Sequence, residues 1–416
     1  MLRSLIVGSI IIIGLQLSAF GLESIDRRRP QFQNEFGYIV TPLPFILPGV
    51  GTGVGLLGGL NNVYETPVDL YLVYITGDVE GGIVGITDIP LVSKRLLLDI
   101  TSVDFNKGQQ NRYLTRGMDS EPDDYNIVEL SDSRLQGGRL ILTFMDRMLE
   151  FYTIGYKVSF KISAVRDNDG NLVNEVEDPE PIESTTWTYG SFLDYTDDRS
   201  DPKKGLRFQL DRTGSTPSDE DAVDYYVMNY SLTSYIPVLS YSTWVFNLFR
   251  SDAHVTRQGE SDPEALKNDF GCYEPTVDQC DPEVQEVIQS QVDQNRYGSA
   301  TSLGGRSRLR SYVGGRYSAA HAEFVGTELR WNLTSENTPF DIWIMRDLRT
   351  GIQMAFFYEI GSVADQRQEL WEETRDSYGI GARLVTGSGF IYRFDLAYGD
   401  EGVATTLFID YPWGAL

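Results

Sequence analysis

Residues 390–398 read Phe-Ile-Tyr-Arg-Phe-Asp-Leu-Ala-Tyr, and this stretch indicates the fold class. Aromatic and aliphatic side chains occupy its even positions, whereas Arg393 and Asp395 occupy odd positions. Alternation of period two is typical of a β-strand, because successive side chains of a strand point to opposite faces. The stretches 205–211 and 378–384 repeat the pattern, with charged residues and glycines on the second face.

Further along the chain in both directions, sixteen segments of this kind can be traced. We expect strands at 49–60, 67–77, 81–88, 95–105, 124–131, 138–147, 149–165, 184–195, 205–213, 222–236, 241–254, 319–333, 352–363, 377–386, 390–399 and 403–411. A soluble sandwich would show the same alternation, but charges beside glycines favour a wet lumen, and an even strand number suits a closed bacterial barrel. Aromatic residues near strand ends fit an interfacial girdle: Trp187, Tyr189, Trp244, Trp331, Tyr411 and Trp413. The predicted fold is therefore all-β, a closed antiparallel transmembrane barrel of sixteen strands over 48–416.

Composition excludes several functions. The chain has 416 residues and a formal net charge of −25, which excludes most nucleic-acid binding because phosphate contacts need a basic face. Only two histidines, His254 and His321, are present, which leaves little room for a His-rich metal site or a catalytic triad. Residues 53–58 match the G-x-G-x-x-G pattern, but the glycines run from 49 to 59 and are better explained by a glycine-rich strand. We expect no enzyme activity, catalytic residue, cofactor or metal site.

The N-terminus predicts export. Arg3 precedes an apolar stretch over 5–17, and Ala19-Phe20-Gly21 offers small residues for cleavage, which is typical of a secretory signal peptide over 1–21. The alternative, a membrane-anchoring helix, would need a longer apolar stretch. Residues 22–47 would then be a short periplasmic segment, and the barrel would lie in outer-membrane lipid.

The connections between the expected strands are unequal. If the last strand ends in the periplasm, 145–148 and 386–389 become tight periplasmic turns, and 166–183 and 255–318 lie on the outer surface. Short inner turns and long outer loops are typical of such barrels. The connections 106–123 and 334–351 would break that rule on the periplasmic side.

Cys272 and Cys280 are the only cysteines, and they lie close together in a polar loop of an exported chain. This spacing favours a local disulfide. Directly afterwards, Asp281-Pro282-Glu283 has the form of a helix start, and Val284, Val287, Ile288 and Val292 follow at helical spacing. We expect a short surface helix there; disorder is the alternative for so polar a segment.

Residues 303–317 read Leu-Gly-Gly-Arg-Ser-Arg-Leu-Arg-Ser-Tyr-Val-Gly-Gly-Arg-Tyr. This stretch resembles the loop motif of the bacterial surface antigen superfamily, the BamA/TamA-like outer-membrane barrels, although Ser311 stands where the family has glycine. The stretch 326–330 resembles the strand after that loop, and 357–361 resembles a later strand, with Glu359 in place of aspartate. Together with the turn at 197–205 and the hairpins at 378–383 and 392–395, the similarity covers about 184–411 in the family's order.

The resemblance implies a sixteen-stranded barrel with a weak seam between its first and last strands and with loop 255–318 folded into the lumen. It implies a lock between loop and wall made by Arg310, Tyr312, Glu359 and Gly361. Strand parity independently turns Glu359 inward, because Met354, Phe356 and Tyr358 form the apolar face. The alternative is that Arg310 is a solvated loop arginine. Further inward-facing charges are expected at Glu328, Arg330, Arg383, Arg393 and Asp395.

Three functions compete at this stage. The first is a family-type role in inserting or translocating proteins or lipids at the outer membrane. The second is a plugged structural or surface-antigen barrel, and the third is a passive pore, against which a long inward loop argues. Family insertases carry periplasmic polypeptide-transport-associated domains, for which 22–47 is too short, so a separate periplasmic or outer-membrane protein would supply that part. Glycines at 49, 51, 53, 55, 58 and 59 would weaken the expected first strand and so favour the first role.

Overall fold

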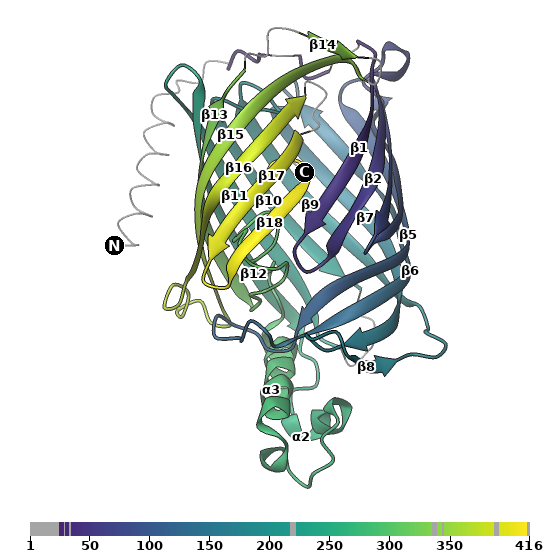
Figure 1. The fold of residues 1–416 in the computed structure, drawn as a ribbon, viewed down its shortest axis with the longest axis vertical. Coiled ribbons are helices and arrows are strands. Elements are labelled where there is room, and N and C mark those ends of the chain that lie inside the picture. The colour runs from purple at the N-terminus through teal and green to yellow at the C-terminus, as the bar shows by residue number, and fades with distance from the viewer. Residues whose placement is uncertain are drawn as a thin grey trace.

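The computed structural model describes residues 25–28, 30–32, 35–216, 222–334, 339–342, 345–386 and 391–413. The proposed signal peptide, 1–21, lies outside these residues. Within them the chain forms a closed antiparallel β-barrel whose strands pair in chain order (Figure 1). The sixteen barrel strands are β1 (Gly37–Leu47), β2 (Gly51–Asn61), β3 (Asp69–Gly77), β4 (Glu80–Val92), β5 (Leu96–Tyr113), β6 (Tyr125–Phe144), β7 (Leu149–Arg166), β9 (Ile182–Thr196), β10 (Gly205–Ser215), β11 (Asp224–Val238), β12 (Ser242–Arg257), β13 (His321–Asn332), β15 (Met345–Ala364), β16 (Arg375–Thr386), β17 (Ile391–Gly399) and β18 (Gly402–Ile409).

Two short strands lie outside the barrel ladder. β8 (Leu172–Glu175) pairs with the end of β7, and β14 (Pro339–Ile342) pairs with the start of β15. A 3-10 turn, η1 (Val63–Glu65), connects β2 to β3, and the other helical elements among the described residues belong to the connection between β12 and β13. In the described part of the chain, no helix has the length and apolarity needed to cross a membrane.

Burial alternates along the strands with the predicted parity. On β17, Arg393 and Asp395 are buried, whereas Phe394, Leu396 and Tyr398 are more than a third exposed. Charged side chains therefore point into the barrel and apolar ones point outward, the reverse of a water-soluble protein. An apolar outer surface requires apolar surroundings, which identifies the molecule as a membrane barrel.

The aromatic residues expected in an interfacial girdle divide into two groups. Trp187, Tyr189, Trp244 and Trp331 lie on the outer surface with between 42% and 52% of their area exposed. For Tyr411 and Trp413 the girdle prediction was wrong, because both are buried. β18 ends at Ile409, and Asp410 adopts a left-handed backbone conformation (φ 87°) that turns the chain inward.

The first barrel strand begins earlier than predicted. β1 occupies Gly37–Leu47, within the segment expected to be a periplasmic tail. Its alternation is clear in the structure, since Ile39, Leu43 and Phe45 are buried. Pro42 and Pro44 concealed it in the sequence, because proline lacks the amide donor of an interior strand and is tolerated mainly at sheet edges.

A second error concerned β6, where two strands were predicted and the structure has one. Because β1 had been missed, the predicted total of sixteen strands still agrees with the structure. Strands were expected at 124–131 and 138–147, but β6 runs without a break over Tyr125–Phe144. The polar stretch between them is a β-bulge in which Asp132 has φ 49°, and β5 and β7 pair with β6 on both sides of it. A bulge uses the residue types of a turn, so composition alone could not separate the two.

The two ends of the barrel differ. The helix end, at the bottom of Figure 1, carries the long connection 258–320, and the connections 114–124 and 167–181 lie there too. The opposite end, named here the terminal end because the described residues before β1 lie there, carries β14 and the tight turn 145–148. Because the prediction missed β1, the strands from β2 to β5 run in the direction opposite to that expected. The connection expected at 106–123 on the periplasmic side therefore lies at the helix end, not at the terminal end. The turn expected at 386–389 lies, apart from its first residue, outside the described residues.

The segment before β1 folds against the terminal end. Arg27 Nη1 lies 3.1 Å from Asp194 Oδ2, and Arg28 Nε lies 2.8 Å from Asp197 Oδ2. Phe32 is buried beneath the cations of Lys94 and Arg147. The described residues of 25–47 are therefore part of the barrel and its terminal end, not a separate segment.

Candidate functional site

The second half of the 258–320 connection folds into the barrel lumen. Residues 298–320, named here the inner half, pair with themselves where Leu303 and Tyr317 exchange two backbone hydrogen bonds of 2.9 and 3.0 Å. Gly304 and Gly305 have φ of 106° and 94°, which only glycine adopts readily, and they reverse the chain there. Apolar side chains of the inner half then pack against the wall residues Tyr235, Val245, Phe249, Phe324 and Val363.

Arg310 points into the ion-pair cluster of the barrel wall and has no exposed surface. Glu359 of β15 accepts two hydrogen bonds from it, one from the backbone N–H at 2.9 Å and one from Nε at 2.8 Å. Nη1 lies 3.0 Å from both Glu328 Oε2 and Asp395 Oδ2. The guanidinium carbon also lies 3.5 Å from the centre of the Phe357 ring. One loop side chain thereby joins three barrel strands: β13, β15 and β17.

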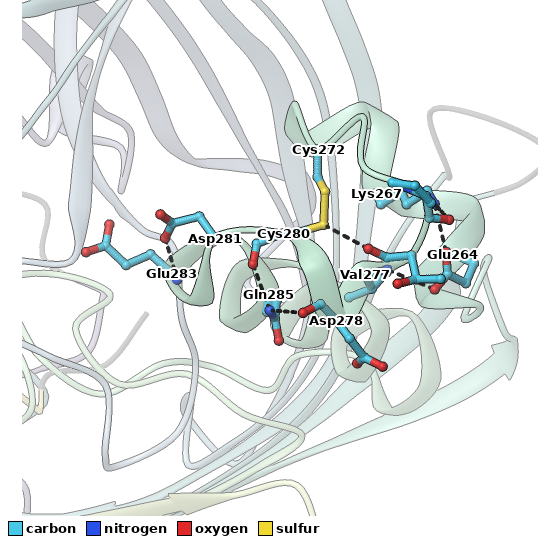
Figure 2. Close-up of a disulfide and its surroundings, with 11 residues drawn as sticks. Glu264, Lys267, Cys272, Val277, Asp278, Cys280, Asp281, Glu283 and Gln285 are labelled. Atoms are coloured by element: carbon cyan, nitrogen blue, oxygen red, sulfur yellow. Dashed lines mark hydrogen bonds and ion pairs between the residues drawn. A yellow bond between two sulfur atoms is a disulfide. The ribbon is translucent and has the colours of Figure 1, made fainter.

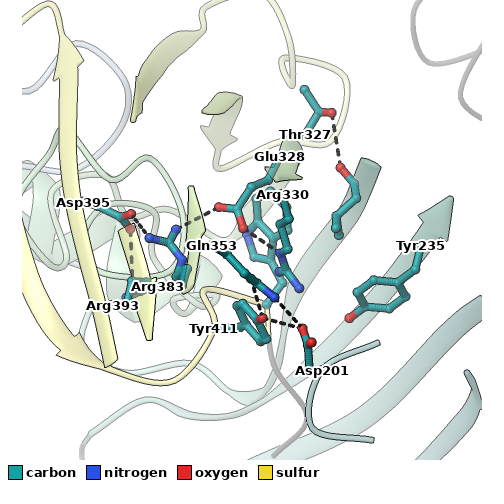
Figure 3. A network of polar contacts seen from close by, with 12 residues as sticks. Asp201, Tyr235, Thr327, Glu328, Arg330, Gln353, Arg383, Arg393, Asp395 and Tyr411 are labelled. Atoms are coloured by element: carbon teal, nitrogen blue, oxygen red, sulfur yellow. Dashed lines mark hydrogen bonds and ion pairs between the residues drawn. The ribbon is translucent and has the colours of Figure 1, made fainter. Parts of the chain in front are cut away.

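The remaining predicted lumen charges pair with one another, as Figure 3 shows for Glu328, Arg383 and Asp395. Glu328 lies 2.8 Å from Arg330 Nε and 3.1 Å from Arg383 Nη2, in addition to its pair with Arg310. Asp395 lies 2.6 Å from Arg383 Nη1 and 3.5 Å from Arg393 Nε. All these groups are buried, and an unpaired buried charge is costly. Mutual pairing therefore stabilises the cluster, and with it the position of the inner half.

Tyr312 and Gly361 complete the predicted lock in a different way. Tyr312 is buried, packs edge-on against Tyr317 at 5.2 Å between ring centres, and accepts a hydrogen bond from the backbone N–H of Asp400 at 3.3 Å. Gly361 provides room, because a Cβ atom there would lie 2.6 Å from Leu303 Cδ1. All nine predicted lumen residues thus lie on the inner half or on the wall that it contacts.

Sequence reasoning missed the part played by the chain end. The Tyr411 hydroxyl lies 2.6 Å from Asp201 Oδ1 and 2.8 Å from Gln353 Oε1, and its ring faces the Arg330 guanidinium at 3.7 Å (Figure 3). Trp413 Nε1 donates to the Ser307 carbonyl at 2.9 Å. Trp413 thus fastens the inner half to the residues after β18, whereas Tyr411 fastens those residues to the barrel. The one available signal was that alternation stops before Tyr411-Pro412-Trp413.

The first half of the connection, residues 258–297, folds outward from the helix end and is named here the outer half. Cys272 and Cys280 form the expected disulfide, with Cα atoms 5.8 Å apart (Figure 2). The outer half comprises α2 (Pro263–Leu266), η2 (Lys267–Phe270), η3 (Val277–Gln279) and α3 (Pro282–Tyr297). Asp281 caps α3 by accepting from the Glu283 N–H, which confirms the predicted helix start.

The barrel has one weakly paired seam. β1 and β18 share a single residue pair, Ile46 opposite Leu407. Elsewhere in the described barrel, neighbouring strands pair along most of their length, and the shortest such ladder, β3–β4, has seven pairs. The beginning of β1 instead meets β15, at two residue pairs.

The family resemblance implies a weak seam, and the glycines of the expected first strand would support it; the argument from the glycines was wrong. The glycine-rich strand is the second one, β2, and it pairs with β1 over eleven residues. The strand at the seam is β1, which contains Pro42 and Pro44. Their missing N–H groups, rather than glycine flexibility, reduce the hydrogen bonds that β1 could form with β18.

The chemistry of the lumen is that of ion pairing. Arginine and carboxylate side chains alternate in it, and no group of three or more histidine, cysteine, aspartate or glutamate side chains that could hold a metal occurs among the described residues. These ion pairs hold a loop inside a barrel that has a weak seam.

Comparisons with known proteins give fold-level similarity. No protein-family model matches the chain, and no curated protein matches it either. Among solved structures, Haemophilus ducreyi BamA lacking POTRA domains 1–3 is similar with a TM-score of 0.47 and 11% identity, over 92% of this chain and 70% of that one. CdiB from Acinetobacter baumannii is similar with a TM-score of 0.49 and 12% identity, over 90% of this chain and 60% of that one. Pseudomonas aeruginosa OprD is similar with a TM-score of 0.34 and 10% identity, over 93% of this chain and 98% of that one. Similarity at this level does not distinguish between functions.

Proposed function

We propose that this protein is an outer-membrane barrel that takes part in inserting or translocating proteins, or lipids, by opening the seam between β1 and β18. The single residue pair between these strands carries the proposal. The helix end would face outward and the terminal end the periplasm, because long connections lie on the outer side of such barrels.

The seam is the place where this barrel opens at the least cost. A backbone hydrogen bond is worth about 4–6 kcal/mol in an apolar medium, so parting a ladder of seven pairs within lipid is prohibitive, whereas parting one pair is not. Pro42 and Pro44 lower the cost further, because they leave no N–H group unpaired at the open edge. The edge of β18, which contains no proline, would then offer its backbone groups to an arriving strand, which is how an added strand is recognised.

The filled lumen argues against a passive pore. A solute pore needs an open path along the barrel axis, but Arg310, Tyr312 and Leu309 of the inner half are at most 1% exposed. A plugged barrel without insertion activity is the second candidate, and the extent of the ion-pair cluster favours it. A separate periplasmic partner belongs to the proposed insertion role.

Locking the seam tests the proposal. A variant with Ile46→Cys and Leu407→Cys joins β1 to β18, since these residues lie opposite each other. Both native cysteines are first replaced by serine so that only the new pair can be oxidised. The matched control is Leu56→Cys with Tyr74→Cys, which joins β2 to β3 at a fully paired position.

The readout is the rate at which an unfolded outer-membrane barrel polypeptide folds into liposomes that contain the protein. We expect faster folding than in empty liposomes, a loss of that acceleration when the seam is oxidised, and recovery on reduction. The β2–β3 control should accelerate folding in both redox states. Acceleration that survives a locked seam, or no acceleration at all, contradicts the proposal and favours the plugged barrel.

A further inference from the structure

The ion-pair cluster around Arg310 contains more arginines than carboxylates. In the cluster around Arg310, four arginines meet three carboxylates: Arg310, Arg330, Arg383 and Arg393 against Glu328, Glu359 and Asp395. Arg393 is the arginine left at the edge. Its Nε lies 3.5 Å from Asp395, and neither its Nε nor its Nη1 has a hydrogen-bond partner among the described residues. This surplus contrasts with the net charge of −25 of the whole chain.

Two loop arginines add to the surplus. Arg306 and Arg308 form no ion pair with any described residue, and Nε of Arg308 is buried without a hydrogen-bond partner. Each guanidinium instead faces an aromatic ring. The guanidinium carbon of Arg306 lies 4.5 Å from the centre of the Phe408 ring, and that of Arg308 lies 3.5 Å from the centre of the Phe249 ring. Arginine does not lose its proton in proteins, so both remain cationic.

These arginines line one cavity of about 590 Å³ inside the barrel. Its charged lining residues are Arg207, Arg306, Arg308, Arg393, Asp211 and Asp410. Arg207 is paired with Asp194 at 3.0 Å, and Asp211 is satisfied by the amides of Gln209 and Asn229. Arg306 and Arg308 thus face the cavity without an ion pair, and Arg393 shares Asp395 with Arg310 and Arg383. Asp410 lies on the same lining and offsets part of the charge of Arg306 and Arg393. Three cations therefore face Asp410 and a shared Asp395, so positive charge stays in excess.

The backbone fixes the two loop arginines in place. The Arg306 carbonyl accepts a hydrogen bond from Arg393 Nη2 at 2.7 Å, and the Ser307 carbonyl accepts one from Trp413 Nε1 at 2.9 Å. The short segment 306–308 is therefore anchored on both sides before any ligand arrives. Preorganised donors bind more tightly, because less conformational freedom is lost on binding.

We propose that this cavity binds a phosphate-type oxyanion, held by Arg306, Arg308 and Arg393. Planar guanidinium groups suit the oxygens of a phosphate, and an anion between the three arginines would balance their charge. Arg306 is exposed and Arg308 is half-buried, so a ligand can reach the site. The volume lies within the range of small-ligand pockets, so the phosphate could be inorganic or belong to a lipid headgroup. The proposal does not depend on the insertion role.

Phosphate titration of the full chain, folded in detergent micelles, tests the site. Inorganic phosphate is added at constant ionic strength, balanced with chloride, and heat release is followed by calorimetry. We expect saturable binding to the native protein, weakened about tenfold or more by Arg308→Gln, since a charge-assisted contact is lost. Arg296→Gln, at an exposed position on α3, is the matched control and should bind as the native protein does.

A second arm distinguishes the two sources of phosphate. The protein is placed in phosphatidylcholine nanodiscs with and without phosphatidic acid, and bound lipid is counted by native mass spectrometry. Retention of phosphatidic acid by the native protein but not by Arg308→Gln, without binding of inorganic phosphate, identifies a lipid headgroup. Binding of inorganic phosphate identifies a site for the free anion.

The proposal is overturned if the native protein binds neither probe, or if Arg308→Gln binds both as tightly as the native protein. Folding of each variant is checked by the difference in gel migration between unheated and boiled samples. Should Arg308→Gln fail to fold, Arg308→Lys replaces it. Lysine keeps the charge but loses the planar fork, so a smaller loss of affinity is expected.

Discussion

The two halves of the connection between β12 and β13 are neighbours in sequence but are stabilised by different means. The outer half, 258–297, has a disulfide and a small apolar core of Leu266, Ile288 and Val292. The inner half, 298–320, packs its apolar side chains against the wall and is fixed by Arg310 and its three carboxylates. The difference follows from what surrounds each half. Outside the barrel the chain must supply its own core, whereas inside it the wall supplies charged partners that water cannot reach.

Removing the central cation should have the largest effect. Arg310→Ala leaves Glu359, Glu328 and Asp395 short of a partner, at a cost of about 3–5 kcal/mol if the site is dry. We expect the inner half to leave the lumen and trypsin to cleave after Arg306, Arg308 and Arg316. Glu359→Gln should act in the same way, and the double variant should be no worse than either single one.

Arg296→Ala is the control for that experiment, because Arg296 is an exposed residue of the outer half. It should leave trypsin cleavage of the inner half unchanged. An inner half that stays protected in both Arg310→Ala and Glu359→Gln would mean that the chain end and the apolar contacts hold it without the ion pairs.

Removing the disulfide should affect the other half alone. Replacing Cys272 and Cys280 by serine opens a short loop, which costs about 2–3 kcal/mol in the chain-entropy model. We expect faster trypsin cleavage after Lys267 and no change in the inner half. Native protein treated with a reducing agent should behave in the same way, and increased cleavage within 298–320 would show that the halves are coupled.

Filling the space at Gly361 should disturb the inner half more mildly. The Cβ of Gly361→Ala would lie 2.6 Å from Leu303 Cδ1, and because that side chain can rotate, we expect a cost of about 1–2 kcal/mol. Gly58→Ala is the control, since nothing lies within 4 Å of its added Cβ. Hydrogen exchange of the inner half measures the effect, and equal exchange in the two variants would contradict the tight packing at Gly361.

Removing the helix cap should have the smallest effect. Asp281→Ala deletes the acceptor for the Glu283 N–H at 3.1 Å, which typically costs about 1 kcal/mol. Faster hydrogen exchange is expected in the first turn of α3 only. Glu274→Ala, an exposed substitution in the same loop, should leave that exchange as it is.

Many of the side chains that face the lumen could be predicted, because the alternation within a single strand shows which of them point inward. Strand parity placed Glu359, Arg393 and Asp395 on the inward face, and an alternating pattern needs no knowledge of the rest of the chain. The close cysteine pair and the Asp-Pro-Glu helix start are local for the same reason. These features are determined within a few residues of sequence, so the sequence by itself was sufficient for them.

What the sequence could not determine depends on partners that are distant along the chain. Pro42 and Pro44 lie in a strand because β2 pairs with β1 along its length, and the Ser-Asp-Ser stretch of β6 continues as a strand because β5 and β7 flank it. Tyr411 turns inward to reach Asp201, which lies more than two hundred residues away along the chain. The number of strands, the weak seam and the surplus of lumen cations arise only when the barrel closes, because closure brings together side chains and edges whose spacing no local pattern records.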